Sequence, residues 1–454
     1  MKESGFVRIA MIGGGYVGLV SGACFAAFGI EVTIVETDPA RLRALAAGLI
    51  PIHEPGLDHL VAQGVAAGRL RFTDQLGEAT AGVDAVFIAV GTPTRRGDGH
   101  ADLRYVTAAA EQVARALTGY SVVVTKSTVP VGTGRRIAAI MRAARPDLAF
   151  DVASNPEFLR EGDAIADFMR PDRVVIGIDP ASPTAARARE VLAGLYAKVA
   201  DTGATILFTG LETAELIKYA ANSFLAMKVT FINEMADLCE RAGADVLELA
   251  RGIGLDARIG PKFLAPGPGF GGSCFPKDTL ALVRIAQDAG APTRLVEGVV
   301  AVNDARKAAM GARVIAACDG DVRGKTIAIL GLTFKPETDD MRDSPALPII
   351  ARLAGDGARL RLHDPVGMHA ARAVLADELA SPAALHWSET AADAIAGADA
   401  VVLVTEWSQY RALDPATLRA AMRGDVIIDL RNQYDPPSMR AAGLRYHGVG
   451  RGGR

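Results

Sequence analysis

The distribution of apolar residues predicts alternating strands and helices in the first part of the chain. Short runs of Val, Ile and Ala, without polar alternation, are typical of strands buried on both faces of a parallel sheet. Helical stretches at 103–117 and 183–199 separate several of these runs. The alternation predicts a doubly wound α/β domain. The predicted strands cover Arg8–Ile12, Glu31–Glu36, Asp84–Val90, Ser121–Lys126, Asp151–Ser154, Arg173–Ile178 and Thr205–Phe208.

The middle of the chain has a different pattern. Leu211–Ala242 contains no Gly or Pro, and its apolar residues recur at helical spacing. A periodic segment of this length predicts one long helix that bridges domains or subunits. The alternative is a pair of helices separated near Phe231.

The pattern of strands and helices returns after Lys325. Predicted strands cover Thr326–Leu330, Arg359–His363, Ala400–Thr405 and Val426–Leu430. The sequence GVDAVFIAV at 82–90 faintly resembles GADAVVLVT at 397–405, which indicates two related domains. We therefore expect two Rossmann-like doubly wound domains, at 1–205 and 306–454, joined by a central helical domain with a long helix at 206–305. No GxGxxG pattern follows the first strand of the last domain, so we expect no second dinucleotide there.

Composition narrows the class of protein. The 454 residues are 50% hydrophobic and 22% charged, as in folded globular chains. The formal net charge of −3 gives no basic footprint for nucleic acid. Four cysteines without CxxC spacing predict neither a disulfide framework nor a metal site, and favour a cytoplasmic location. The segment Ile9–Ile30 lacks charge, but its six glycines and weak flanks argue against a membrane span.

The motif Gly13-x-Gly15-x-x-Gly18 follows the first predicted strand and opens a helix. Such glycines allow a tight turn and the close approach of a pyrophosphate to a helix N-terminus. The next strand ends in Glu36, 18 residues after Gly18, where a carboxylate can bind ribose hydroxyls. That acid favours NAD over NADP, although the nearby Arg41 weakens the preference. The alternative is a glycine turn that serves packing alone.

Cys274 lies in GFGGSCFPKD, between a glycine-rich segment and an apolar helical run. Most isolated cysteines are small buried apolar residues, which is our interpretation of Cys24, Cys239 and Cys318. A glycine-rich approach and a helix start favour a reactive thiolate at Cys274 instead. Both interpretations of Cys274 stay open on spacing alone. Asp278 follows four residues later, on the same face if the helix begins that early.

Further polar candidates are weak individually. Lys218 and Asn222 lie four residues apart on the predicted long helix, where they could stabilise an oxyanion or simply face solvent. Glu157 and Glu161 follow a predicted strand, and Thr128 follows another. The carboxyl ends of strands are where open α/β sheets bind ligands.

Taken together, the motifs resemble those of the UDP-glucose 6-dehydrogenase family, in order along nearly the whole chain. GGSCFPKD and the upstream KYAAN are the most specific of them. The resemblance implies a four-electron oxidation of UDP-glucose by two NAD and water to UDP-glucuronate. The motifs are GGGYVGL, Glu36, PIHEPGL at 51–57, VGTPT at 90–94, KSTVPVGT, SNPEFLREG, ELIKYAANSFLA, GPGFGGSCFPKD and LGLTFKPETDDMRDSP.

The resemblance also implies roles for individual residues. Cys274 would trap an aldehyde as a thiohemiacetal, which is oxidised to a thioester. Lys218 and Asn222 match the pair that stabilises the oxyanion. Asp278 matches a proton-handling carboxylate that acts through an ordered water. Glu157 matches a general acid and base, and Thr128 a hydroxyl that positions water.

Binding residues follow from the same match. Contacts to NAD are expected from Gly13, Gly15, Tyr16, Val17, Gly18, Glu36, Arg41, Thr92, Thr128, Glu161, Lys277 and Arg342. Contacts to the UDP-sugar are expected from Glu157, Phe158, Leu159, Arg160, Glu161, Lys218, Asn222, Arg258, Phe263, Leu264, Ala265, Pro266, Gly267, Gly271, Lys335 and Arg431. Arg258 would serve the neighbouring subunit, which implies a homodimer or a higher homo-oligomer. Ala265 departs from the family, where many members carry a larger polar residue.

Three alternatives stay open. The same reaction could act on another nucleotide sugar, such as GDP-mannose. The chain could be a non-catalytic NAD-binding scaffold, although every reactive position is retained. A two-electron dehydrogenase of the β-hydroxyacid type would need neither the cysteine nor a second nucleotide-type domain.

Overall fold

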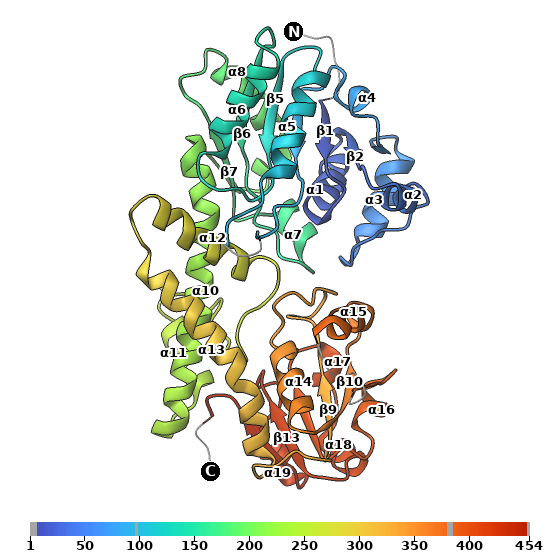
Figure 1. Ribbon diagram of the computed structural model, residues 1–454, viewed down its shortest axis with the longest axis vertical. Coiled ribbons are helices and arrows are strands. Elements are labelled where there is room, and N and C mark those ends of the chain that lie inside the picture. The colour runs from blue at the N-terminus through green and yellow to red at the C-terminus, as the bar shows by residue number, and fades with distance from the viewer. Residues whose placement is uncertain (1–6, 96–98, 379–384, 452–454) are drawn as a thin grey trace. The chain divides into compact units, whose positions relative to one another are not determined.

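The computed structural model describes residues 7–95, 99–378 and 385–451. The chain divides into two compact units, Met1–Ala221 and Asn222–Arg454, and each unit contains its own sheet flanked by helices (Figure 1). The predicted α/β class with two doubly wound sheets and a long central helix is confirmed. The division into three domains at 1–205, 206–305 and 306–454 stays a prediction.

The first unit contains an eight-stranded sheet in the order β3-β2-β1-β4-β5-β6-β7-β8. The strands from β3 to β6 are parallel, whereas β7 runs antiparallel to β6 and parallel to β8. The reversal at β7 is not predicted by the sequence, because buried runs read alike in both directions. The strands are β1 Arg8–Ile12, β2 Glu31–Val35, β3 Leu70–Thr73, β4 Ala85–Ile88, β5 Ser121–Thr125, β6 Phe150–Ser154, β7 Arg173–Ile178 and β8 Thr205–Thr209.

Helices cover both faces of this sheet, which explains the continuous apolar runs. Ile9 and Met11 of β1 belong to one buried apolar cluster, and Ala10 and Ile12 belong to another. The predicted helix at 183–199 is divided into two helices at Tyr196. The helices are α1 Tyr16–Ala27, α2 Pro39–Ala46, α3 Leu57–Ala66, α4 Leu76–Thr80, α5 Arg104–Ala116, α6 Thr133–Ala144, α7 Ala164–Met169, α8 Ala185–Leu195 and α9 Ala197–Ala200.

Helix α10, Leu211–Ala242, runs unbroken for 32 residues from the end of the first unit into the second. The predicted bounds are confirmed, and the alternative of a break near Phe231 is wrong. Three further helices follow, α11 Val246–Gly254, α12 Phe275–Asp288 and α13 Arg294–Ala317.

The second sheet is parallel, with six strands in the order β11-β10-β9-β12-β13-β14. Its strands are β9 Thr326–Leu330, β10 Arg359–His363, β11 Leu385–Trp387, β12 Ala400–Leu403, β13 Val426–Asp429 and β14 Arg445–Gly448. Its helices are α14 Ala346–Gly355, α15 Met368–Glu378, α16 Ala391–Ile395, α17 Ser408–Arg411, α18 Pro415–Ala421 and α19 Pro436–Ala441.

The two copies of the faint internal repeat make the same pair of hydrogen bonds in their respective units. The carboxylate of Asp84 accepts a hydrogen bond from Arg8 N at 3.0 Å, and its own N–H donates to Arg8 O at 2.9 Å. Asp399 makes the same exchange with Thr326, both bonds at 2.8 Å. In each unit, the aspartate that directly precedes the fourth strand in the sequence, β4 or β12, thus caps the start of the first strand, β1 or β9. The two sheets share the strand order as well as this cap.

The cysteines and the hydropathy of the helices bear on the class of protein. All four cysteines are free thiols. Within the described ranges, no helix has the length and hydropathy that a membrane crossing requires. The cytoplasmic location stays a prediction.

Candidate active site

In the glycine-rich turn between β1 and α1, some glycines are required by packing and another leaves space for a ligand. A Cβ on Gly13 would lie 2.7 Å from Ala89 O, and one on Gly18 would lie 1.9 Å from Gly13 O. Both glycines are therefore required by the protein's own packing. A Cβ on Gly15 would meet no atom within 4 Å, and no side chain caps the N-terminus of α1 there. Open space beside free helix N–H groups fits the pyrophosphate of a dinucleotide.

Glu36 follows β2 directly and lies beside this turn. Its carboxylate is buried and accepts hydrogen bonds from Gly14 N at 3.2 Å and Asp38 N at 2.8 Å. Arg41 forms an ion pair with it at 3.3 Å. The backbone of the turn and α2 thus hold the acid at the edge of the glycine loop, where a ribose would follow the pyrophosphate. Its contact with NAD stays a prediction.

The carboxyl ends of β4 and β5 are tied to each other. The hydroxyl of Thr92 is buried and donates to Thr128 O at 2.9 Å. Ser127 donates to Val90 O at 2.6 Å in the same region. Thr128 itself is half-buried. The predicted residues of these two loops therefore lie side by side at one edge of the first sheet.

Glu157 and Lys218 form a buried ion pair, with Oε1 and Nζ 3.1 Å apart. Their side chains are 7% and 3% exposed. The other carboxylate oxygen accepts from Leu159 N at 2.6 Å, and Phe158 lies with its ring 5.4 Å from Nζ. The alternative of a solvated helix-surface lysine is wrong for Lys218. Such a pair is costly to bury, and removal of either partner would leave a buried charged group without compensation.

A second buried lysine lies within electrostatic reach of this pair. Lys126 ends the run of β5 and donates to Asn155 Oδ1 at 3.1 Å and to Tyr196 Oη at 3.3 Å. Burial lowers the pKa of Lys126 to about 8; the charge of Glu157 raises it, and that of Lys218 lowers it further. No role for Lys126 was predicted from the sequence. The available signal was a lysine at the end of a valine-rich predicted strand.

Cys274 differs from the other three cysteines in its surroundings. It is half-buried, precedes α12 at the N-cap position, and lies with Sγ 3.6 Å from Ser273 Oγ. Cys24, Cys239 and Cys318 are buried. Burial and, to a lesser degree, Glu54 raise the pKa of Cys24 to about 12, and burial also raises the pKa of Cys239 and Cys318. These three thiols are therefore held in the protonated, unreactive form.

Asp278 lies one turn into α12 and is fully buried. Its N–H donates to Cys274 O at 2.8 Å, which closes the first turn of the helix. Its carboxylate accepts from Asn222 Nδ2 and from Lys277 Nζ, both at 2.7 Å. The second unit thus joins four predicted residues, Cys274, Asp278, Asn222 and Lys277, around the head of one helix. Asn222 is buried here, so the alternative of a surface amide is wrong.

The glycine segment 267–272 packs against the loop that follows β9. A Cβ on Gly271 would lie 2.3 Å from Asp343 O, and one on Gly267 would lie 3.0 Å from Arg431 Nη1. Arg431 donates to Phe334 O at 3.2 Å and pairs with Glu406 at 3.0 Å. Gly267, Gly271 and Arg431 are thus brought together, with Lys335 Nζ 5.5 Å from the Phe334 ring.

Further predicted residues border these groups: Arg342 O accepts from Gly272 N at 2.8 Å, and the Phe263 ring lies 6.0 Å from that of Phe275, which follows Cys274. The exposed arginines pair with carboxylates close in sequence: Arg160 with Asp167, Arg258 with Asp256, and Arg342 with Asp340. Leu264 and Pro266 are buried and Ala265 is exposed, whereas Phe263 has a positive φ of 64°. Within the described part of the chain, no three His, Cys, Asp or Glu side chains gather as metal ligands would.

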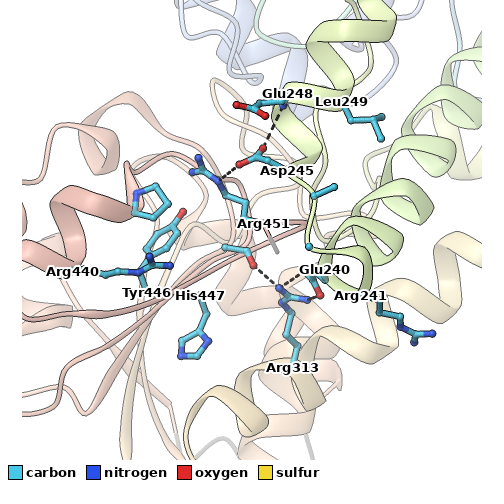
Figure 2. A pocket seen from close by; sticks show the side chains of 14 residues that line it. Glu240, Arg241, Asp245, Glu248, Leu249, Arg313, Arg440, Tyr446, His447 and Arg451 are labelled. Carbon is cyan, nitrogen blue, oxygen red and sulfur yellow. Dashed lines mark hydrogen bonds and ion pairs between the residues drawn. The ribbon is translucent and has the colours of Figure 1, made fainter. Parts of the chain in front are cut away.

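A cavity of about 1050 Å³ in the second unit contains none of the predicted site residues (Figure 2). It lies where α10 ends, beside β14. Two of its arginines are paired with carboxylates: Arg313 with Glu240 at 2.6 Å and Arg451 with Asp245 at 3.1 Å.

Comparison with known families identifies the chain. Three models of the UDP-glucose/GDP-mannose dehydrogenase family match in order: the NAD binding domain at residues 7–200, the central domain at 212–305 and the UDP binding domain at 328–436. The chain belongs to this family. The family predicted from the motifs is thereby confirmed, and so is its cofactor, since the first unit contains the NAD binding domain of these dehydrogenases.

Individual members of the family are similar over their whole length. A UDP-glucose 6-dehydrogenase of Rhizobium meliloti is 57% identical over 98% of this chain and 100% of its own. One of Bacillus subtilis is 45% identical over 98% of this chain and 93% of its own. The solved structure of a UDP-glucose dehydrogenase from Pyrobaculum islandicum has a TM-score of 0.88 at 39% identity and covers 99% of both chains.

Proposed function

We propose that this chain oxidises UDP-glucose to UDP-glucuronate with NAD, through a thioester on Cys274. The similarity to UDP-glucose 6-dehydrogenases along the full chain supports the substrate. The observation that carries the mechanism is Cys274, a half-buried thiol at the head of α12, one turn before Asp278, whose carboxylate is fixed by Asn222 and Lys277.

NAD, when bound, would accept the hydride in both oxidations. We assign its pyrophosphate to the open space at Gly15 and its adenosine ribose to Glu36, whose charge disfavours a 2′-phosphate. The further NAD contacts named from the sequence remain part of this proposal: Gly13, Tyr16, Val17, Gly18, Arg41, Thr92, Thr128, Glu161, Lys277 and Arg342.

The first oxidation converts the C6 alcohol into an aldehyde and releases one proton. The thiolate of Cys274 then attacks the aldehyde carbon to form a thiohemiacetal. Loss of a second hydride from that carbon gives a thioester. Water attacks the thioester, C6 becomes a carboxylate, and the thiolate is released. Because the thiolate captures the aldehyde within the site, the reactive intermediate is not released.

The charged residues have separate tasks in this scheme. Lys218 and Asn222, one turn apart on α10, stabilise the oxyanion, because an ammonium and an amide both donate to it. Glu157, paired with Lys218, moves protons during formation and hydrolysis of the thioester, with Thr128 positioning the water. Asp278 is fixed by two donors. It exchanges protons with the reacting thiol and with the oxygen on C6 through an ordered water.

The UDP moiety carries about two negative charges and requires cations and backbone donors. We propose that Lys335 and Arg431 of the second unit serve it, beside the glycine segment. Arg258 is 89% exposed, as a residue that serves the neighbouring subunit would be. The remaining sugar contacts proposed are Phe158, Leu159, Arg160, Glu161, Phe263, Leu264, Ala265, Pro266, Gly267 and Gly271.

Cys274→Ala tests the covalent step. We expect steady-state formation of UDP-glucuronate to fall by several orders of magnitude, as loss of a nucleophile usually causes. The measurement is NADH formed per sugar consumed, across a panel of UDP- and GDP-sugars, with wild type giving two. Cys239→Ala is the matched control, because it removes a buried thiol, and it should keep this stoichiometry. A folded Cys274→Ala enzyme that still gives two NADH per sugar at a near-normal rate would exclude the thioester.

A further inference from the structure

Glu54, in the motif PIHEPGL, ties three segments of the first unit together. Its side chain is 6% exposed, and both carboxylate oxygens are engaged. Oε1 accepts from Ala164 N at 2.7 Å. Oε2 accepts from Gly162 N at 2.6 Å and from the hydroxyl of Tyr16. One buried carboxylate therefore holds the start of α1, the loop before α7, and α7 itself.

The first of these segments belongs to the glycine-rich turn. Tyr16 is the first residue of α1 and directly follows Gly15, where the structure leaves space for a pyrophosphate. Burial and the hydrogen bond to Glu54 raise the pKa of Tyr16 far above its usual value. The phenol therefore stays protonated and donates to Glu54 at every physiological pH. Its position depends on where that carboxylate lies.

The second segment is the loop 157–162, which presents Glu157. This loop is fixed at its beginning by the ion pair between Glu157 and Lys218. It is fixed at its end by Glu54, through Gly162, whose φ of 84° turns the chain into α7. Arg160 adds a bond to Asp167 within α7. A displacement of Glu54 would therefore move the end of a short loop whose beginning contains a candidate catalytic group.

We propose that Glu54 is a positioning residue that couples dinucleotide binding at the glycine-rich turn to the loop 157–162. The inference rests on the proposed function, because it takes that turn as the NAD site and that loop as part of the sugar site. Charge-assisted hydrogen bonds to three donors make Glu54 a rigid link. A glutamine has one acceptor oxygen, and its NH₂ group would face a buried backbone N–H, leaving that donor unsatisfied.

Glu54→Gln tests the coupling through ligand binding. NADH and UDP-glucose form a pair that does not react, so the dissociation constant of NADH can be measured by fluorescence with and without UDP-glucose. We expect the two constants to differ in wild type and to become equal in Glu54→Gln. The affinity for NADH alone should fall about tenfold, the loss typical of one unsatisfied buried donor. Equal constants in wild type, or an unchanged ratio in Glu54→Gln, would overturn the proposal.

Asp151→Asn is the matched control for a purely structural effect. Asp151 is a buried carboxylate in the same unit that also accepts from a tyrosine, Tyr120, at 2.7 Å, and from Ser182. It lies near the start of β6, away from the strand's carboxyl end. Its variant should lose stability and keep the ratio of the two constants. If Asp151→Asn abolished that ratio as fully as Glu54→Gln, general destabilisation would replace the coupling.

Tyr16→Phe separates this inference from the proposed function. It removes only the hydroxyl that reaches Glu54, so its effect on NADH affinity should disappear in the Glu54→Gln background. Additive losses in the double variant would contradict the link. This readout requires neither turnover nor UDP-glucose. A chain that fails to oxidise UDP-glucose but passes this cycle would refute the proposed function and retain the link between Tyr16 and Glu54.

Discussion

Glu215 lies on α10 one turn before Lys218, and its carboxylate reaches the start of α6. It is 2% exposed and accepts from Gly132 N at 2.6 Å and Gly134 N at 2.7 Å. Burial raises its pKa to about 7, because the two backbone N–H groups compensate only part of the lost hydration. At the scale of single residues, this group gives the chain a defined pH dependence.

We predict that Glu215 makes the protein less stable as pH rises from about 4.5 to 7. The unfolded chain releases the proton near 4.5, whereas the folded chain keeps it until about 7. The stabilisation is therefore complete below 4.5 and lost as pH rises to 7, with a slope of at most about 1.4 kcal/mol per pH unit. Chemical denaturation at several pH values should show a flatter profile for Glu215→Gln. Glu234→Gln, exposed on the same helix, should leave the profile unchanged, and an unflattened profile in Glu215→Gln would contradict the assignment.

At the scale of elements, the end of α10 is fastened to the segment after β14. Glu240 accepts from both terminal nitrogens of Arg313, which lies on α13 (Figure 2). It also accepts from Gly450 N at 2.7 Å. The N–H of Val246, at the start of α11, donates to Gly450 O at 2.9 Å. Burial tends to raise the pKa of Glu240, but the bonds from Arg313 and Gly450 lower it below its usual value. Glu240 therefore stabilises the fold most when its carboxylate is ionised.

Glu240→Ala should lower the free energy of unfolding by about 2 kcal/mol, because it leaves a charged donor and a backbone N–H without their acceptor. The loss should shrink as pH falls through the lowered pKa of Glu240, where the wild-type carboxylate also loses its charge. Glu248→Ala, an exposed acid on the wall of the same cavity, is the control and should cost much less. Equal losses in the two variants would show that the contacts of Glu240 add nothing.

At the scale of the whole molecule, α10 exposes large apolar side chains at seven-residue spacing. Phe224, Phe231 and Leu238 are 58%, 45% and 56% exposed. Two turns of a helix take about seven residues, so the three lie on one face. Such a stripe on a long helix suits a second copy of this chain. It supports the proposed homo-oligomer, in which Arg258 would serve the neighbouring subunit.

Phe231→Glu should therefore reduce the oligomer to single chains, because a charge would be buried at the centre of the stripe. Sedimentation would report the mass, and activity should fall with it if Arg258 acts on the neighbouring subunit's substrate. Leu295→Glu places a charge on another exposed apolar residue, outside α10, and should leave the mass unchanged. A wild-type chain that sediments as a monomer, or an unaltered mass in Phe231→Glu, would contradict this arrangement.

Elements with a local signal could be predicted from the amino-acid sequence. β1, β7, β9, β10 and α10 have the predicted bounds, since each shows an apolar run, an alternation or a helical period within its own sequence. β3, β11 and β14 were missed, because they are short and mostly partly exposed. Motif residues such as Cys274 and Glu36 could be singled out because glycines and strand ends around them are close in sequence.

Which side chains meet depends on the three-dimensional packing of the chain. Glu157 and Lys218, Asn222 and Asp278, and Glu54 with its three donors lie far apart in the chain. Their contacts depend on the order of strands in the sheet and on the course of α10, which no local pattern encodes. Burial depends on the same folding, and it moves the pKa of Lys126 and Glu215 toward neutrality. The sequence therefore identifies candidate residues. Their partners and their charge states depend on packing, because packing brings together residues that are distant in the chain.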